Sequence, residues 1–195
     1  MNITVMKGVF LFLADGFEEI EALATVDLLR RGGIQVRTVS ITHDRTVRGA
    51  HGIPVIADQP RDEFDTSQIP GSTADDVMIF PGGMPGAKNL AEDYYLMEQA
   101  KKHFADGGTV AAICAAPGLV VSQLPGIEGR KVTCYDGFEE ALMNEGAEYT
   151  GEPVETDGNL ITGRGPGCAV RFAVEIIRKV KGDEVAEKVF AGLLA

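Results

Sequence analysis

The feature that most constrains the fold is the alternation of short apolar runs with longer segments of helical pattern. The first run, residues 5–13, has Lys7 as its only charged residue, which is typical of a strand buried on both faces. We expect further strands at residues 36–41, 76–80, 109–113 and 131–134, a short hairpin or edge element at 47–56, and a strand pair over 154–162. Strands separated by helices predict an α/β fold in which helices cover both faces of a mostly parallel sheet.

Helices are expected between these strands. The first has Asp15 in the position of an N-cap, Glu18 three residues later as its capping-box partner, and Gly32-Gly33 as its end. The expected helices cover residues 15–31, 87–104, 115–123, 138–144, 166–179 and 183–194. In such folds the functional residues gather where the strands end. The candidate positions therefore follow the strands, at residues 14–21, 81–86, 114–118, 135–136 and 163–168.

Length and charge narrow the classes of function. The 195 residues contain no internal repeat or long linker, so we expect a single domain over residues 1–195. Asp and Glu number 29 against 18 Lys and Arg, a formal net charge of −11. This charge disfavours binding to nucleic acid or to an anionic membrane surface. No apolar run is long enough to span a membrane, and residues 1–13 fit a buried strand better than a signal peptide.

The cysteines and histidines point to a reducing compartment without a metal site. Cys114, Cys134 and Cys168 are odd in number and widely spaced, so we expect no disulfide framework and a cytoplasmic location. The three histidines lack ligand spacing with one another or with the cysteines. We therefore expect no metal and no cofactor.

Cys114 is the candidate nucleophile. It follows the small-residue strand Ala111-Ala112-Ile113 and precedes Ala115-Ala116-Pro117-Gly118. A tight strand-to-helix turn of this kind lifts the side chain above the sheet, and small neighbours let the backbone turn sharply. The partial positive charge of a helix N-terminus would favour the thiolate. The alternative is a buried structural cysteine, which is how most free cysteines behave.

The glycines after the strand at 76–80 are candidate oxyanion donors. Pro81-Gly82-Gly83 exposes backbone N–H groups that can hold an oxyanion beside Cys114. The glycine spacing and the Lys-Ser/Thr ending of a phosphate-binding loop are missing. The alternative is a plain turn between a strand and a helix.

Glu21 is the candidate acid–base group. A helical wheel puts Phe17, Ile20 and Leu28 on one apolar face with Ala24, while Glu21 flanks that face and Glu18 and Glu19 point away. Partial desolvation would raise the pKa of Glu21, which could then stay protonated, donate a hydrogen bond to a thiolate and shuttle protons. The alternative is a solvated acid in the first turns of the helix.

Asp27 also falls near the apolar face, and we interpret it as a structural acid.

The glycine-rich segment 162–168 is a further candidate loop. Pro166 fits the first position of a helix, and the glycines allow close approach to another loop or subunit. Cys168 stands at this helix start and is either a second reactive thiol or a packed side chain. Cys134 ends a strand, where we expect it to be buried.

Taken together, these residues resemble the ThiJ/PfpI family, and within it the protein-deglycase branch. The matching motifs are residues 13–21, 26–34, 81–83, 111–115 and 163–167. The resemblance implies a flavodoxin-like three-layer sandwich and a homodimer. It implies that Cys114 is the reactive, easily oxidised thiol and that protonated Glu21 hydrogen-bonds it. It also implies that Gly82, Gly83 and Ala115 supply backbone amides near the sulfur, with Tyr135, Arg30, His51 and Arg164 as possible borders of the site.

Three residues depart from the family pattern. The protease-like branch has a histidine where this chain has Ala115, so we do not expect a peptidase. The deglycase branch often has a histidine at the position of Tyr135. If that histidine assists catalysis, either Tyr135 substitutes for it or the reaction is slower. Threonine is usual at the position of Cys168, so its redox behaviour is not carried over.

Two hypotheses of different class follow. The first is a cofactor-free glyoxalase or deglycase in which the Cys114 thiolate adds to methylglyoxal, glyoxal or their protein adducts, with Glu21 moving the proton. The second is a redox sensor or chaperone that responds to oxidation of Cys114 to a sulfinate held by Glu21.

Overall fold

A seven-stranded sheet forms the centre of the protein. The computed structural model describes residues 8–64 and 75–194, and its sheet has the order β10-β11-β7-β6-β1-β2-β5. All neighbours are parallel except the β10–β11 pair, which confirms the predicted α/β class. The strands are β1 (Val9–Leu13), β2 (Val36–Ser40), β5 (Gln59–Pro60), β6 (Val77–Phe80), β7 (Thr109–Ile113), β10 (Val154–Asp157) and β11 (Leu160–Gly163).

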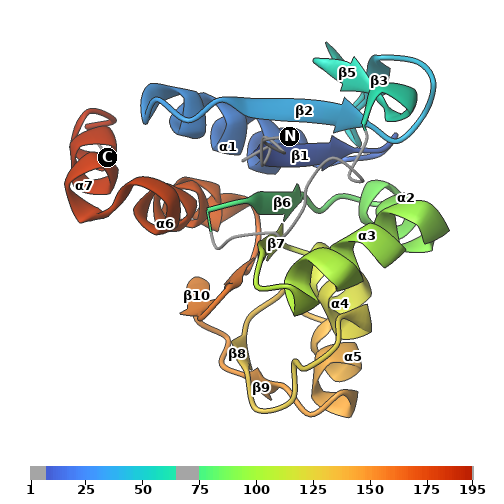
Figure 1. The fold of residues 1–195 in the computed structure, drawn as a ribbon, viewed down its shortest axis with the longest axis vertical. Helices are drawn as coiled ribbons and strands as arrows, with labels where there is room; N and C mark the ends of the chain where they lie inside the picture. The colour runs from blue at the N-terminus through green and yellow to red at the C-terminus, as the bar shows by residue number, and fades with distance from the viewer. Residues whose placement is uncertain (1–7, 65–74, 195) are drawn as a thin grey trace, which may run out of the picture.

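Helices cover both faces of this sheet (Figure 1). One layer holds α1 (Glu19–Arg31), α6 (Ala169–Lys181) and α7 (Asp183–Ala191). The other holds α2 (Gly86–Glu92), α3 (Tyr94–Ala105) and α4 (Ala116–Leu119), with α5 (Glu139–Asn144) packed against α4. Two small sheets lie outside the main one: β3 (Thr46–Arg48) with β4 (Pro54–Ile56), and β8 (Lys131–Val132) with β9 (Glu148–Tyr149). None of the described helices is long and apolar enough to cross a membrane.

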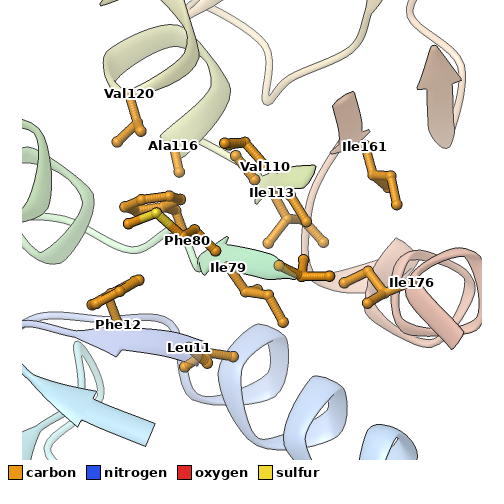
Figure 2. Packing of buried hydrophobic residues seen from close by; sticks show 14 of the residues in the cluster. Leu11, Phe12, Ile79, Phe80, Val110, Ile113, Ala116, Val120, Ile161 and Ile176 are labelled. Atoms are coloured by element: carbon orange, nitrogen blue, oxygen red, sulfur yellow. The ribbon is translucent and has the colours of Figure 1, made fainter. Parts of the chain in front are cut away.

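The core fills both sides of the sheet because successive strand residues point to opposite faces. Figure 2 shows Leu11 and Ile79 on the side of α1 and α6, and Phe12 and Phe80 on the opposite side. The rings of Phe12 and Phe80 stack with their centroids 5.4 Å apart. Every residue of β1 is buried, so the strand ends, rather than the strand interiors, are free to carry functional groups.

The first helix begins later than the sequence predicts. Glu18, not Asp15, is the N-cap of α1, and its carboxylate accepts a hydrogen bond from the Glu21 N–H at 2.7 Å. The Asp15 carboxylate instead accepts from the Arg48 N–H at 2.8 Å. The helical wheel was also wrong about three side chains: Ile20 is 58% exposed, whereas Glu18 and Glu19 are buried. The helix therefore turns a face to the sheet that differs from the expected one.

Two other expected helices are interrupted. The segment predicted as 87–104 consists of α2 and α3, because Asp93 ends the first and caps the second by accepting from the Leu96 N–H at 3.0 Å. The same carboxylate is held by Arg61 at 2.6 Å. The segment predicted as 115–123 is the short α4 followed by a 3-10 turn at Val121–Gln123.

The remaining differences lie at element ends. The strand expected at 131–134 is only two residues long and pairs with β9 instead of joining the main sheet. The helix expected from Pro166 begins as a 3-10 turn, Pro166–Cys168, and continues as α6. The first expected strand is confirmed over Val9–Leu13, and its residues 5–7 lie outside the described residues.

His103 makes the stability of this fold sensitive to acid. Its ring is buried in α3, and Nε2 lies 3.0 Å from the Thr109 carbonyl oxygen. Burial lowers the pKa of His103 below 6.5, although Thr109 and Asp76 raise it in part. The unfolded chain therefore takes up a proton at a higher pH than the folded chain, so stability falls as the pH drops below about 6.5.

We expect the free energy of unfolding of His103→Gln to change less between pH 7 and pH 5 than that of the wild type. Urea unfolding of both proteins across this range measures the difference. Parallel curves for the two proteins would contradict the assignment of this pH dependence to His103.

Candidate functional site

Cys114 lies where β7 ends, in a backbone conformation that few residues adopt. Its φ is +67°, in the left-handed region that disfavours side chains with a Cβ. Two hydrogen bonds hold it there. The Cys114 N–H donates to the Gly163 carbonyl at 2.9 Å, and the Tyr135 N–H donates to the Cys114 carbonyl at 2.8 Å. A strained turn that lifts a buried thiol above the sheet matches the predicted nucleophile geometry.

Gly82 brings the thiol and the candidate acid together. A Cβ on Gly82 would lie 2.5 Å from Cys114 Cβ, 2.9 Å from its Sγ and 2.7 Å from Glu21 Oε2. No side chain fits in that space, so glycine is required for the two groups to share it. The end of β6, the end of β7 and the first turn of α1 therefore meet at one point, as expected at the carboxyl edge of a parallel sheet.

Glu21 is fully buried at this point. Its Oε2 accepts from the Gly82 N–H at 2.8 Å, whereas no N–H or O–H of the described residues bonds its buried Oε1. Burial raises the pKa of Glu21 to about 7, although the Cys114 thiol and the Gly82 N–H act in the opposite direction. Because Oε2 accepts a hydrogen bond, the proton of the neutral acid belongs on Oε1. The Glu21 carboxyl thus titrates near neutral pH, as a group suited to acid–base chemistry does.

The protonation of the Cys114 thiol is coupled to that of Glu21. Burial and the ionised Glu21 carboxylate raise the pKa of Cys114 to about 12, while the N–H groups of Gly83 and Ala115 lower it. The charge of Glu21 no longer opposes the thiolate when Glu21 holds the proton. The expected thiolate-promoting helix N-terminus is weak here, because α4 has only four residues.

Backbone amides surround the sulfur, but not all three that the sequence suggests. Those of Gly83 and Ala115 interact with Cys114. The Gly82 amide instead serves Glu21. The Gly82 carbonyl accepts from the Glu18 N–H at 2.9 Å, which ties the glycine turn to the start of α1. Two N–H groups are thus left to stabilise negative charge at the thiol or on a bound oxygen.

His51 fastens the β3–β4 hairpin to the start of α1. Its N–H donates to Glu19 Oε1 at 2.7 Å, and its Nδ1 lies 2.8 Å from Glu19 Oε2. Although burial raises the pKa of Glu19, the bonds from His51 outweigh it and keep that pKa below 4.5. Donor atoms of Glu18, Glu19 and His51 lie within 4.8 Å of one another, a set that can hold a metal ion. Because these carboxylates already accept from Glu21 and His51, we assign them to holding the loops together.

The other predicted border residues are placed unequally. Tyr135 is bonded to the Cys114 backbone and is 49% exposed. Arg164 follows the Gly163 that bonds Cys114, and its guanidinium pairs with Asp136 at 2.7 Å. Arg30 lies at the far end of α1 from Glu21 and pairs with Asp58 at 2.7 Å. Its side chain is therefore not brought to Cys114 within this chain.

The remaining cysteines differ from Cys114. All three thiols are free. Cys134 is buried, and burial together with the charges of Glu139 and Asp136 raises its pKa to about 12. Cys168 is half-buried at the turn before α6. Within residues 8–64 and 75–194, Cys114 is the one cysteine with a carboxyl partner whose pKa lies near neutrality.

Comparison with known proteins adds the family. The model of the DJ-1/PfpI family matches residues 7–179. The chain belongs to the DJ-1/PfpI family. It is 35% identical over 188 residues to protein DJ-1 homolog A of Arabidopsis thaliana, a match that covers 96% of this chain and 46% of that protein. The chain thus spans about half the length of this curated relative.

Two further relatives match along most of their length. A glutathione-independent glyoxalase of Caenorhabditis elegans, DJR-1.2, is 32% identical over 169 residues, covering 86% of this chain and 84% of that protein. The crystal structure of a mutant of the DJ-1 superfamily protein STM1931 from Salmonella typhimurium superposes with a TM-score of 0.84 at 32% identity, covering 97% of this chain and 98% of that one. The chain thus has the flavodoxin-like fold of the DJ-1 superfamily.

Much of the site was predicted from the sequence, but its supports were not. Cys114, Glu21 and the two glycines were singled out by their positions after strands. Glu18 and Glu19 were expected to point away and are buried supports instead. Gly49 and Gly52, on either side of His51, were the available signal for a tight turn. The sequence did not reveal that His51 bonds Glu19, because Glu19 is 32 residues away in the chain.

Proposed function

We propose that this protein is a glutathione-independent glyoxalase in which Cys114 is the nucleophile and Glu21 the acid–base group. The observation that carries the proposal is the convergence of a strained, buried thiol and a carboxyl of pKa about 7 on Gly82. A nucleophile beside a group that titrates near the working pH is what aldehyde addition followed by proton transfer requires. The similarity to a relative named as a glutathione-independent glyoxalase supports the same reaction class.

The proposed reaction begins with addition of the thiol to methylglyoxal or glyoxal. The Cys114 sulfur forms a bond to the aldehyde carbon, and the carbonyl electron pair moves to oxygen, giving a hemithioacetal. The N–H groups of Gly83 and Ala115 stabilise the developing oxyanion. The thiol proton passes to Glu21 and from Glu21 to this oxygen, which completes the hemithioacetal and leaves Glu21 ionised for the next step. Because Cys114 and Glu21 are buried, these two amides act in a low-dielectric environment.

Glu21 completes the reaction by moving a proton between carbons. It removes the hydrogen of the former aldehyde carbon and returns a proton to the neighbouring carbon through an enediol. This leaves a thioester on Cys114. Water then hydrolyses the thioester and restores the thiol, so methylglyoxal plus water gives lactate and glyoxal plus water gives glycolate, with no external oxidant. Protein adducts of these aldehydes are the second substrate class.

The reaction is tested by incubating the protein with methylglyoxal, without glutathione, and measuring lactate enzymatically. We expect lactate in proportion to protein concentration. The pH profile of kcat/KM should rise around pH 7, because the Cys114–Glu21 pair must lose one proton before addition. Lactate formation that is flat between pH 5.5 and 8.5 would contradict the assignment of Glu21.

We further propose that the protein is a homodimer. Large apolar side chains are exposed on the outer face of α1, at Ile20 and Leu23, and on the β3–β4 hairpin, at Ile53 and Ile56. The bonds between His51 and Glu19 join these two elements. An exposed apolar surface of this kind marks an association site, and a second copy of the chain presents the same surface.

The variant Ile20→Lys should shift the protein from dimer to monomer, because it places a charge on this apolar surface. Light scattering coupled to size exclusion measures the mass. The matched control is Tyr94→Lys on α3, which removes an exposed aromatic side chain elsewhere. Equal masses for Ile20→Lys and the wild type would contradict an interface at α1.

A further inference from the structure

Two loops lie on either side of the Cys114 backbone. The first, residues 133–138, connects β8 to α5, and the second, residues 164–168, connects β11 to α6. Both originate far from Cys114 in the sequence. The first loop contains Tyr135, whose N–H bonds the Cys114 carbonyl. The second loop directly follows Gly163, whose carbonyl accepts from the Cys114 N–H. Gly163 ends β11 and is held by its pairing with β7, so the conformation of the nucleophile depends on the sheet on one side and on the position of the first loop on the other.

The left-handed backbone of Cys114 makes this dependence strong. A non-glycine residue with φ of +67° persists only where its surroundings hold it. Here its N–H and its carbonyl are both engaged, one with each side. If the first loop moves away, the hydrogen bond from Tyr135 lengthens and the residue can relax, which displaces the sulfur from Glu21 and from the amides.

An ion pair joins the two loops next to these hydrogen bonds. Arg164 Nη2 lies 2.7 Å and its Nε 3.3 Å from Asp136 Oδ1. Arg164 directly follows Gly163, and Asp136 directly follows Tyr135. The Tyr135 ring also lies against Gly165, where a Cβ would be 3.2 Å from its Cδ2. The contact between the loops thus falls one residue from each hydrogen bond to Cys114.

Arg164 is itself fixed from a third side. Its Nη1 donates to the Gly151 carbonyl at 3.2 Å, and its backbone N–H donates to the Pro153 carbonyl at 3.0 Å. The segment before β10 therefore holds the guanidinium in place. Because Asp136 pairs with this guanidinium, its position is fixed relative to the main sheet. Asp136 in turn fixes the position of the neighbouring Tyr135, whose N–H bonds the Cys114 carbonyl.

We propose that Asp136 and Arg164 are positioning residues that clamp the two loops and hold the Cys114 thiol in its reactive orientation. The clamp touches neither the thiol nor the substrate in this arrangement. It acts through the backbone of Tyr135 and Gly163. Its effect on turnover rests on the proposed function, but its effect on the Cys114 backbone and on thiol reactivity does not.

The competing interpretation is a surface ion pair without consequence. The side chains of Arg164 and Asp136 are 45% and 73% exposed, and exposed pairs contribute little to global stability. Thermal midpoints therefore do not distinguish the two interpretations. Local measurements at Cys114 do, because a clamp changes the loops beside the nucleophile and a mere surface pair does not.

The test compares Asp136→Asn and Arg164→Gln with the charge-reversed double variant Asp136→Arg/Arg164→Asp. Two readouts are used: the NMR hydrogen-exchange rate of the Tyr135 amide, and the rate of alkylation of Cys114 by iodoacetamide, followed by peptide mass mapping. The matched control is the exposed pair of Arg45 and Glu63, at 3.0 Å, altered by Glu63→Gln. It removes an ion pair of similar exposure that is remote in sequence from Cys114.

We expect each single variant to speed exchange of the Tyr135 amide by up to about fivefold, the largest factor that an exposed ion pair supplies. Alkylation of Cys114 should change by a similar factor, the double variant should restore both rates in part, and Glu63→Gln should alter neither. Lactate formation should show a lower kcat with an unchanged KM in the single variants.

Exchange and alkylation rates that match those of the wild type, or that change equally in Glu63→Gln, would overturn the clamp. So would a double variant no closer to the wild type than either single variant. If the wild type makes no lactate while the two local readouts change as expected, the glyoxalase proposal fails and the clamp stands. If lactate forms normally and the local readouts do not move, the reverse holds.

Discussion

Replacing Glu21 by glutamine is expected to reduce lactate formation from methylglyoxal by about a thousandfold or more, within the range that a positioned acid–base group contributes. Glutamine has the same shape and can still accept from the Gly82 N–H, but it cannot take the thiol proton or move a proton between carbons. Steady-state rates between pH 6 and 8 measure the loss. A Glu21→Gln protein with more than about a tenth of the wild-type kcat would remove Glu21 from the proposed mechanism.

The same substitution is expected to stabilise the fold at alkaline pH. The folded-state pKa of Glu21, about 7, lies above its unfolded value of 4.5, so the stability associated with this carboxyl is full below pH 4.5 and is lost as the pH rises through 7. The shift corresponds to about 3 kcal/mol at pH 8. Glutamine has no charge to bury and avoids this cost.

Urea unfolding of the wild type and Glu21→Gln at pH 5 and pH 8 measures this effect. The stability advantage of the variant should be larger at pH 8 than at pH 5. An equal difference at both pH values would mean that Glu21 is not desolvated as its burial indicates. Function and stability thus oppose each other at this residue, as is common at active sites.

Replacing Cys114 by serine is expected to abolish lactate formation and leave the fold intact. A hydroxyl occupies nearly the same space as the thiol, but at neutral pH it is a far weaker nucleophile without a stronger base beside it. Lactate assays and circular dichroism of the same samples measure the two properties. The matched control is Cys168→Ser, which removes a half-buried thiol that has no such acid–base partner and should retain activity.

Activity that survives in Cys114→Ser would contradict covalent catalysis at this residue. Loss of activity in Cys168→Ser alone would move the chemistry to the loop before α6. Treating the same proteins with mild peroxide tests the redox-sensor hypothesis separately from the glyoxalase hypothesis. The redox-sensor hypothesis predicts that mild peroxide adds two oxygens to Cys114 before it modifies either other cysteine.

The sequence was sufficient to predict the main strands of the parallel core and insufficient to predict where its elements are interrupted. Apolar runs such as Val9–Leu13 and Thr109–Ile113 directly indicate buried strands. The break between α2 and α3 could not be predicted, because Asp93 is held there by Arg61, a partner 32 residues away. The expected strand at 131–134 was shortened for a similar reason, since its pairing with β9 depends on tertiary contacts.

For the candidate site too, the sequence predicted the residues at strand ends but not the contacts between distant segments. Cys114 and Glu21 were predicted because the carboxyl ends of strands, and the loops that follow them, meet at one edge of a parallel sheet. The burial of Glu19 was missed because a helical wheel takes no account of the hairpin that covers the helix start through His51. The ion pair of Asp136 and Arg164 joins residues 28 apart, which local pattern does not reveal.

The central claim is that Cys114 forms a covalent bond to the aldehyde carbon and that Glu21 then moves the proton. NMR of methylglyoxal labelled isotopically at the aldehyde carbon, added to Glu21→Gln, tests it most directly. We expect a signal of a sulfur-bound hemithioacetal that forms more slowly than in the wild type, because water must take the thiol proton, and that accumulates because proton transfer between the carbons is blocked. We expect no such signal in Glu21→Gln/Cys114→Ser. No sulfur-bound signal with an intact thiol, or the same signal in the double variant, would contradict the account.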